Sequence, residues 1–201
     1  MQLIKRFFTS ASLIFTLMFS SFSFAQQSPN ELLSTVGQQL FAQIAELDST
    51  DKVQKRAELK AIVKSDLFPY VDMNFVSFKL LGKHIREINK TEITAFVAAV
   101  EENLSSTYAN ALMAYKGQKV VFDQAAQQID GKYATVKAKI LDPSAPEIDL
   151  QFKLRQNQDG EWKVYDMVAE GISLLSAKQK EIVRRISDVG LTKVIEELNN
   201  S

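Results

Sequence analysis

Few side chains in this sequence have the chemistry that catalysis or metal binding requires. Cys is absent and His84 is the one histidine, which excludes thiol chemistry, thiolate metal sites and a two-histidine metal site. His84 follows a predicted helix end between Lys83 and Arg86. We interpret it as a surface residue because it has few partners for a catalytic triad. Residues 171–173 lack the glycine pattern of a nucleophile elbow, and no phosphate-binding loop or dinucleotide fingerprint is present.

Asp166 is a candidate carboxyl group for acid–base chemistry. Held in an apolar pocket with Tyr108 or Tyr115 as the acid, it would suit a cofactor-free isomerase or dehydratase. The simpler interpretation is that Asp166 pairs with a backbone or basic group near a sheet edge. We favour this second interpretation because no spacing in the sequence requires the first. The prediction is therefore a binding protein without a cofactor or metal rather than an enzyme.

Helices are predicted on both sides of a central group of strands, and together these elements would position the candidate residues. Ser28, Pro29 and Asn30 form a helix start signal, and Gly82, Gly117 and Gly190 mark helix ends. The clearest element has an apolar stripe from Ile93 to Tyr115 at helical spacing. The predicted helices cover residues 30–47, 51–67, 72–81 and 93–115, followed by two more after Ser176 and after Gly190.

Strands are predicted between these two groups of helices. Asp130-Gly131 is a strong hairpin signal, and residues 133–141 and 148–155 alternate between apolar and polar side chains. With residues 119–129 and 161–168 they give a four-stranded antiparallel meander that has one apolar face. The predicted fold class is α+β: a curved sheet covered by the N- and C-terminal helices, similar to a nuclear-transport-factor-2-like cone with a hydrophobic pocket.

Residues 1–25 are predicted to be a cleaved signal peptide. Lys5 and Arg6 precede an apolar run over residues 7–19, which is about 13 residues and too short to cross a bilayer. Small residues at 23 and 25 place the cut before Gln26. Residues 26–201 then form one domain, and without Cys it has neither disulfides nor a lipid-modified Cys as anchor. These features together indicate a bacterial periplasm.

Charge argues against nucleic acid as a partner. Lys and Arg number 24, as do Asp and Glu, so removal of Lys5 and Arg6 leaves a slight acidic excess rather than a basic footprint. What remains in excess is large apolar side chains. The residues alone do not separate a packed core from a lined cavity, so three functions stay open: a carrier of an apolar ligand, a pocket enzyme, and an interaction module with a solid core.

Four strings in the chain form a recognisable set: FPYVD at residues 68–72, LLGK at 80–83, TYANAL at 107–112 with Tyr115 and Gly117, and WKVYDMVAEGISL at 162–174. Together they resemble the MlaC family of periplasmic phospholipid-binding proteins, also called toluene-tolerance auxiliary proteins. The last string is the most specific, and the order and spacing of the set run through most of residues 26–201. Ile85 and the single Gly190 depart from the family pattern, where an aromatic residue and a Gly-Gly pair are common.

The resemblance implies a shuttle that carries phospholipid between an outer-membrane lipoprotein–porin complex and an inner-membrane ABC transporter with a hexameric lipid-binding subunit. Such a shuttle maintains the lipid asymmetry of the outer membrane. We expect the acyl chains between the sheet and the long helix, and the headgroup in water at the mouth. Lys83 and Arg86 could contact its phosphate, although solvated surface charges are the favoured interpretation. The candidate lipid-binding residues are Phe75, Leu81, Phe96, Val100, Leu104, Tyr108, Leu112, Val136, Ile140, Leu150, Phe152, Val164, Val168 and Ile172.

Overall fold

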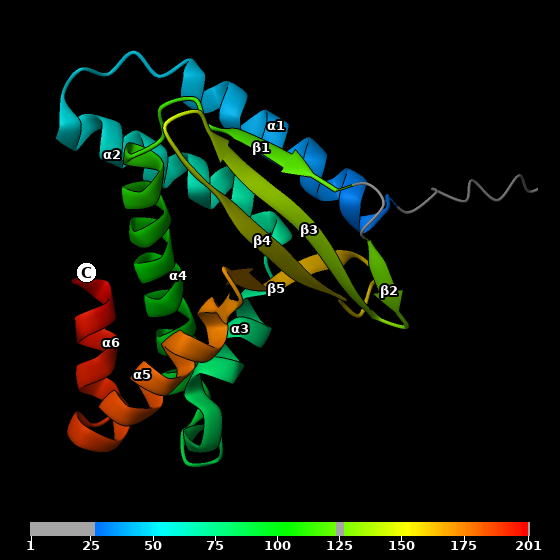
Figure 1. Ribbon diagram of the computed structural model, residues 1–201. Helices are drawn as coiled ribbons and strands as arrows, with labels where there is room; N and C mark the ends of the chain where they lie inside the picture. The colour runs from blue at the N-terminus through cyan, green and yellow to red at the C-terminus, as the bar shows by residue number, and fades with distance from the viewer. Residues whose placement is uncertain (1–26, 124–126, 201) are drawn as a thin grey trace, which may run out of the picture.

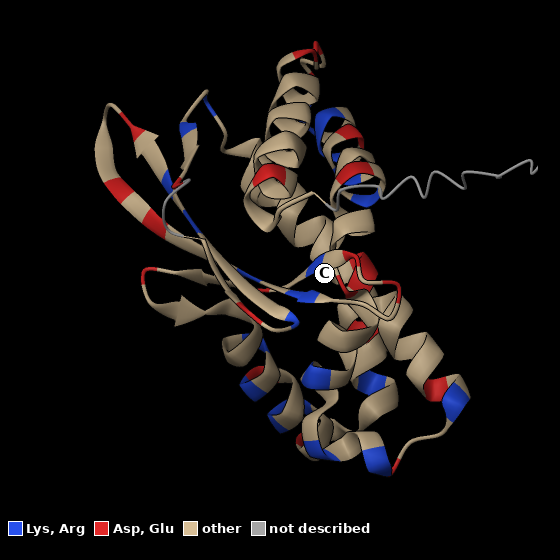
Figure 2. Ribbon diagram, turned by 90° about the vertical axis from the view of Figure 1, so that its right-hand side faces the viewer, with Lys and Arg blue, Asp and Glu red and all other residues tan. Residues whose placement is uncertain are grey.

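The computed structural model describes residues 27–123 and 127–200. The expected signal peptide at residues 1–25 lies outside this range. Among the described residues, no helix combines the length and the apolar character that crossing a membrane requires. Basic and acidic positions are interspersed over the helices (Figure 2).

The N-terminal helices begin where the sequence predicts them. Helix α1 (Pro29–Ala45) starts with a capping box in which Ser28 and Glu31 bond to each other's backbone N–H groups. Asp51 caps α2 (Lys52–Ile62). The chain then continues into a π-helical turn (Val63–Leu67) and a 3-10 turn (Phe68–Tyr70). The predicted single helix over 51–67 is therefore α-helical only in its first part, and its last turn widens just before Pro69, which cannot extend it.

The remaining helices pack together at the other end of the molecule. They are α3 (Met73–Leu81), the 3-10 turn Gly82–Arg86, α4 (Lys90–Met113), α5 (Leu174–Val189) and α6 (Leu191–Asn199). A second capping box, Asn89 with Glu92, starts α4. The cap of α5 is Ser173 rather than the expected Ser176, because the Ser173 side chain accepts the N–H of Ser176.

Within residues 27–123 and 127–200 the sheet has six strands, not the four predicted. They are β1 (Lys119–Phe122), β2 (Gln128–Asp130), β3 (Tyr133–Asp142), β4 (Ala145–Gln156), β5 (Trp162–Ala169) and β6 (Ile172–Ser173), in the order β1-β3-β4-β5-β6 with β2 also paired to β3. The chain over 119–129 forms two strands because β1 pairs with one half of the long β3 and β2 with the other. The added β6 arises because Glu170 and Gly171, both at positive φ, reverse the chain directly after β5.

A β-bulge in β5 changes which side chains face the helices. Lys153 pairs with Asp166, but the next residue, Leu154, pairs with Val164, so Tyr165 is an extra residue in β5. Beyond the bulge Met167 pairs with Phe152 and therefore shares its face of the sheet, whereas Val168 pairs with Gln151 on the opposite face. The simple alternation that placed both Val164 and Val168 on the inner face is thus wrong for Val168.

Three buried clusters within the described residues hold these elements together, and Figure 1 shows α1 running alongside the sheet with α3, α5 and α6 grouped below it. Leu33 of α1 packs on the apolar face of β3, β4 and β5, and Leu40 and Ile44 of the same helix meet α2 and α4. The largest cluster joins α3, α4, α5 and α6. Helix α1 therefore covers the sheet, and α4 links the sheet half to the helical half. The coarse α+β class is as predicted, while likeness to a nuclear-transport-factor-2-like cone stays a prediction.

Candidate functional site

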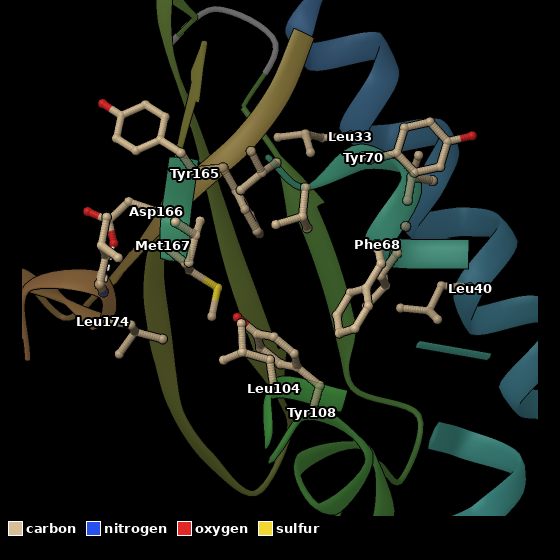
Figure 3. Close-up of a pocket in the computed structure, with 18 of the residues that line it drawn as sticks. Leu33, Leu40, Phe68, Tyr70, Leu104, Tyr108, Tyr165, Asp166, Met167 and Leu174 are labelled. Atoms are coloured by element: carbon tan, nitrogen blue, oxygen red, sulfur yellow. Dashed lines mark hydrogen bonds between the residues drawn. The ribbon is translucent and has the colours of Figure 1, made fainter. Parts of the chain in front are cut away.

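A cavity of about 300 Å³ lies between α1, the apolar face of the sheet and the C-terminal half of α4 (Figure 3). Helix α1 contributes one stripe of side chains. The sheet contributes Phe122, Phe152, Val164 and Met167, and α4 contributes Leu104 and Tyr108. Gly37 lets α1 come close to the sheet, since a Cβ there would lie 3.3 Å from the Phe122 ring. The lining residues are Leu33, Val36, Gly37, Leu40, Phe41, Leu67, Phe68, Tyr70, Val71, Val76, Leu80, Leu104, Tyr108, Val120, Phe122, Phe152, Val164, Tyr165, Asp166, Met167, Leu174, Leu175 and Lys178.

The lining is almost entirely aliphatic and aromatic. The volume of the cavity is at the lower end of the range of about 300–1,000 Å³ that is typical of ligand sites. Met167 projects its flexible thioether into the middle of the space (Figure 3). A flexible, polarisable side chain adapts to guests of different shape. Such a surface favours an apolar guest that needs little hydrogen bonding.

Asp166 lines the cavity, but its carboxylate already has partners. It accepts hydrogen bonds from the Ser173 hydroxyl at 2.8 Å and from the Leu175 backbone N–H at 3.0 Å, and it pairs with Lys153 at 3.5 Å. The residue is 7% exposed. These contacts confirm the expected pairing with backbone and basic groups, and they join β5 to the first turn of α5. A buried carboxylate with three partners is a structural group rather than a free base.

Tyr108 brings a phenol into the cavity from α4. Burial raises the pKa of the Tyr108 phenol, and the negative charge of Asp166 raises this pKa further. The hydroxyl therefore stays protonated at neutral pH and remains a hydrogen-bond donor. Tyr115, the other candidate acid, is not among the lining residues and instead stacks on Phe41 with ring centroids 4.8 Å apart.

The cavity reaches solvent at the start of α5. Leu174 lines the cavity and is 39% exposed. One turn further along the helix, Lys178 also lines it, with 30% of its side chain exposed and an ion pair to Glu181 at 3.1 Å. We take this corner as the mouth, because it is where a lining leucine and a lining ammonium group both reach water.

Four of the candidate lipid-binding residues line the cavity: Leu104, Tyr108, Phe152 and Val164. Leu81, Phe96 and Val100 lie instead in the solid core formed by α3 to α6, and Val136 lies in the core between α1 and the sheet. These four are so tightly surrounded that they have almost no exposed surface. The helical and alternating patterns that identified them describe packed and cavity-facing positions equally well.

The other six candidates are also outside the lining. Leu112 packs against the cluster that joins α1 and α2. Ile140 and Leu150 lie toward the end of the β3–β4 pair at which Asp142 pairs with Ala145. Val168 is on the opposite face of the sheet because of the bulge. Ile172 is 63% exposed.

Phe75 is held outside the cavity by α3. Its ring lies edge-on to Tyr165 at 5.3 Å and beneath the Arg155 guanidinium at 4.3 Å. Arg155 also bonds Asp72 at 2.8 Å, at the start of α3. Phe75 therefore helps to fix α3 to β4 and β5.

The basic residues expected near a phosphate lie elsewhere. Lys83 and Arg86 are exposed on the 3-10 turn after α3 and do not line the cavity, whereas Lys178 does. His84 contacts Glu87 and Ser187, each at 3.3 Å, and its side chain is 12% exposed, so it is more covered than the surface residue that was predicted. The spacing in the sequence indicates this position, because Lys178 follows Leu174 by one helical turn and therefore lies on the same face of α5.

Sequence reasoning also missed most of the cavity wall that α1 provides. Leu33, Val36 and Leu40 recur at helical spacing and form one apolar face of α1. That face covers the sheet, and its continuation borders the cavity. Met167 was missed because the bulge that turns it inward leaves no mark in the alternation of β5.

Comparisons with known proteins point to one family. A family model described as MlaC protein matches residues 35–200. The intermembrane phospholipid transport system binding protein MlaC of Haemophilus influenzae is 30% identical over 98% of this chain and 94% of that protein. The toluene tolerance protein ttg2D of Pseudomonas putida is 26% identical, over 81% of this chain and 74% of its own length.

A solved structure shares the fold. The phospholipid-binding protein from Ralstonia solanacearum, solved in complex with a phospholipid, has a TM-score of 0.73 to this chain. The match covers 87% of this chain and 98% of that one, at 18% sequence identity. The arrangement of sheet and helices is therefore one that occurs in a solved protein.

Proposed function

The chain belongs to the MlaC family, and from this membership and its apolar cavity we propose that it carries phospholipid between the outer and inner membranes of a bacterial envelope. It hides the acyl chains of one lipid while the lipid crosses water. The related protein of Haemophilus influenzae bears the name of an intermembrane phospholipid transport binding protein, and the solved relative holds a phospholipid.

The physical need for such a carrier follows from the size of the acyl chains. Removing a methylene group from water is worth about 0.8 kcal/mol, so two chains with roughly 30 methylenes would require on the order of 20 kcal/mol to expose. A lipid leaves a bilayer slowly unless another apolar surface replaces the bilayer. The lining between α1 and the sheet offers that surface without any catalytic group.

The lining also suggests how the lipid is oriented. An aliphatic and aromatic wall suits acyl chains and offers few partners to a headgroup, so we place the headgroup outside, at the mouth beside Leu174 and Lys178. A headgroup in water forms few hydrogen bonds with the protein, so one cavity accepts several kinds of headgroup. The Lys178 ammonium group can exchange Glu181 for a lipid phosphate.

The partners and the compartment follow from the family resemblance. We propose that residues 1–25 direct export, that residues 26–201 act as a single periplasmic domain, and that the protein exchanges lipid with an outer-membrane lipoprotein–porin complex and an inner-membrane ABC transporter. This exchange maintains the lipid asymmetry of the outer membrane.

The two alternative functions have less support. An interaction module with a solid core does not account for a cavity that opens beside α5. A pocket enzyme with Asp166 as its base would have to break the contacts of that carboxylate with Ser173, Leu175 and Lys153.

Native mass spectrometry of protein purified from a bacterial periplasm tests the proposal. We expect a bound mass equal to one phospholipid, released by organic extraction and identified as a mixture of headgroups. A protein that carries no lipid after gentle purification, and takes none from vesicles, would contradict the carrier function.

A further inference from the structure

Three tyrosines line the cavity, and the hydroxyl of Tyr108 lies toward its interior, whereas those of Tyr70 and Tyr165 point away from it (Figure 3). The ring projects from α4 into the cavity, with its oxygen on the side of Met167 (Figure 3). Within residues 27–123 and 127–200, no group forms a hydrogen bond with this oxygen. A partly buried hydroxyl that gains an acceptor is stabilised by the added hydrogen bond, so a guest molecule that offers an acceptor at this position is favoured.

The nearest charged lining group does not supply it. The Asp166 carboxylate is engaged by Ser173, Leu175 and Lys153, and the other residues around Tyr108 in the cavity wall, such as Leu104, are apolar. Once a guest molecule displaces water from the cavity, the guest itself is therefore the source of an acceptor for the phenol.

A phospholipid has one kind of acceptor between its acyl chains and its headgroup, namely the oxygens of its two esters. The acyl chains themselves have none, and the phosphate belongs with the headgroup at the mouth. Because Leu174 and Lys178 set the mouth at the start of α5, a lipid inserted tails first brings its ester groups in past this corner.

We propose that the Tyr108 hydroxyl donates a hydrogen bond to an acyl-ester carbonyl oxygen of the bound phospholipid, and that this bond sets the depth at which the lipid is held. The inference rests on the proposed carrier function. It assigns to the cavity a preference for ester-linked over ether-linked lipids, because an ether lacks the carbonyl and leaves the phenol unpaired.

Competition between two lipids tests this inference. The full mature protein is incubated with vesicles that contain equal amounts of a diester and a diether phosphatidylcholine with chains of equal length, and the bound lipids are extracted and quantified. We expect wild type to retain the diester about threefold to tenfold over the diether, the range given by one hydrogen bond. In Tyr108→Phe this ratio should fall to near one.

Tyr133→Phe is the matched control, since Tyr133 lies outside the cavity lining and is 51% exposed, and it should keep the wild-type ratio. An equal ratio in wild type, or an unchanged preference in Tyr108→Phe, would overturn the inference while leaving the carrier function intact. Absence of both lipids from wild type would instead contradict the carrier function itself.

Infrared spectroscopy of wild-type protein loaded with carbonyl-labelled diester lipid gives a second test that does not depend on a variant ratio. One labelled carbonyl band should lie at lower frequency than the band of the same lipid in an alkane, as hydrogen bonding requires, and should move back in Tyr108→Phe. Identical band positions in the two proteins would also overturn the inference.

Discussion

Met167 lies opposite Phe152 across the β4–β5 pair, and both side chains line the cavity. This pairing exists because Tyr165 is an extra residue in β5. Without the bulge, Asp166 would share the face of Val164 and Met167 would point away from α1. One inserted residue thus places a thioether in the apolar lining and leaves Asp166 able to reach the first turn of α5.

Met167→Glu should prevent lipid retention, because it would bury a carboxylate among acyl chains, at a cost of several kcal/mol. We expect occupancy after purification to fall at least tenfold, measured by native mass spectrometry. Gln151→Glu is the control: Gln151 pairs with Val168 on the opposite face, so the same new charge should leave occupancy unchanged. Full occupancy in a folded Met167→Glu protein would show that the inner face is assigned wrongly.

Asp166→Asn should lower the free energy of unfolding by about 1–3 kcal/mol, since it removes the charge that pairs with Lys153 and weakens the acceptor for Ser173 and Leu175. Urea denaturation of both proteins measures the difference. Lys153→Gln should have a smaller effect because Lys153 is more exposed. Equal stability of wild type and Asp166→Asn would refute the structural role of this carboxylate.

The acid dependence of stability should include a contribution from Asp142. Hydrogen bonds from the Ser144 hydroxyl and backbone N–H, and from Gln118, lower the pKa of Asp142 to about 2. A pKa lowered in the folded state gives stability that is present above the ordinary value and is lost as the pH falls toward about 2. The stability difference between wild type and Asp142→Ala should therefore shrink between pH 4 and pH 2, and a difference independent of pH would contradict it.

Lys178→Gln should slow uptake of anionic phospholipid from vesicles by up to about fivefold at low salt, because a partly exposed ion pair is worth up to about 1 kcal/mol. Lys180→Gln, on the exposed side of the same helix, is the control and should have little effect. A transfer assay with fluorescent lipid measures both variants. Equal rates for Lys178→Gln and wild type would remove Lys178 from the proposed mouth.

Local sequence signals predicted most of the helices, because caps and apolar stripes act over a few residues. The start signal at Ser28 is confirmed, and capping boxes of Ser28 with Glu31 and of Asn89 with Glu92 begin α1 and α4. The sheet was predicted less well. The bulge at Tyr165 is set by pairing with β4, and the division of residues 119–129 into β1 and β2 is set by pairing with β3, neither of which alternation in one strand encodes.

The cavity was harder to predict than the fold, because a cavity wall and a core use the same residues. Phe96 and Leu104 lie on one apolar stripe of α4, yet Phe96 is packed in the α3–α6 core while Leu104 lines the cavity. The difference depends on what lies opposite each side chain. That is decided by the placement of α1 and α5, elements distant in sequence from α4.

Photo-crosslinking tests most directly whether acyl chains occupy this cavity. A phospholipid with a diazirine in one acyl chain is loaded into the protein, irradiated, and the modified residues are mapped by mass spectrometry of peptides. We expect modification of cavity residues such as Leu33, Leu104, Phe152 and Met167. Modification confined to exposed apolar residues such as Ile129 and Ile172, with the cavity residues unmodified, would contradict the account.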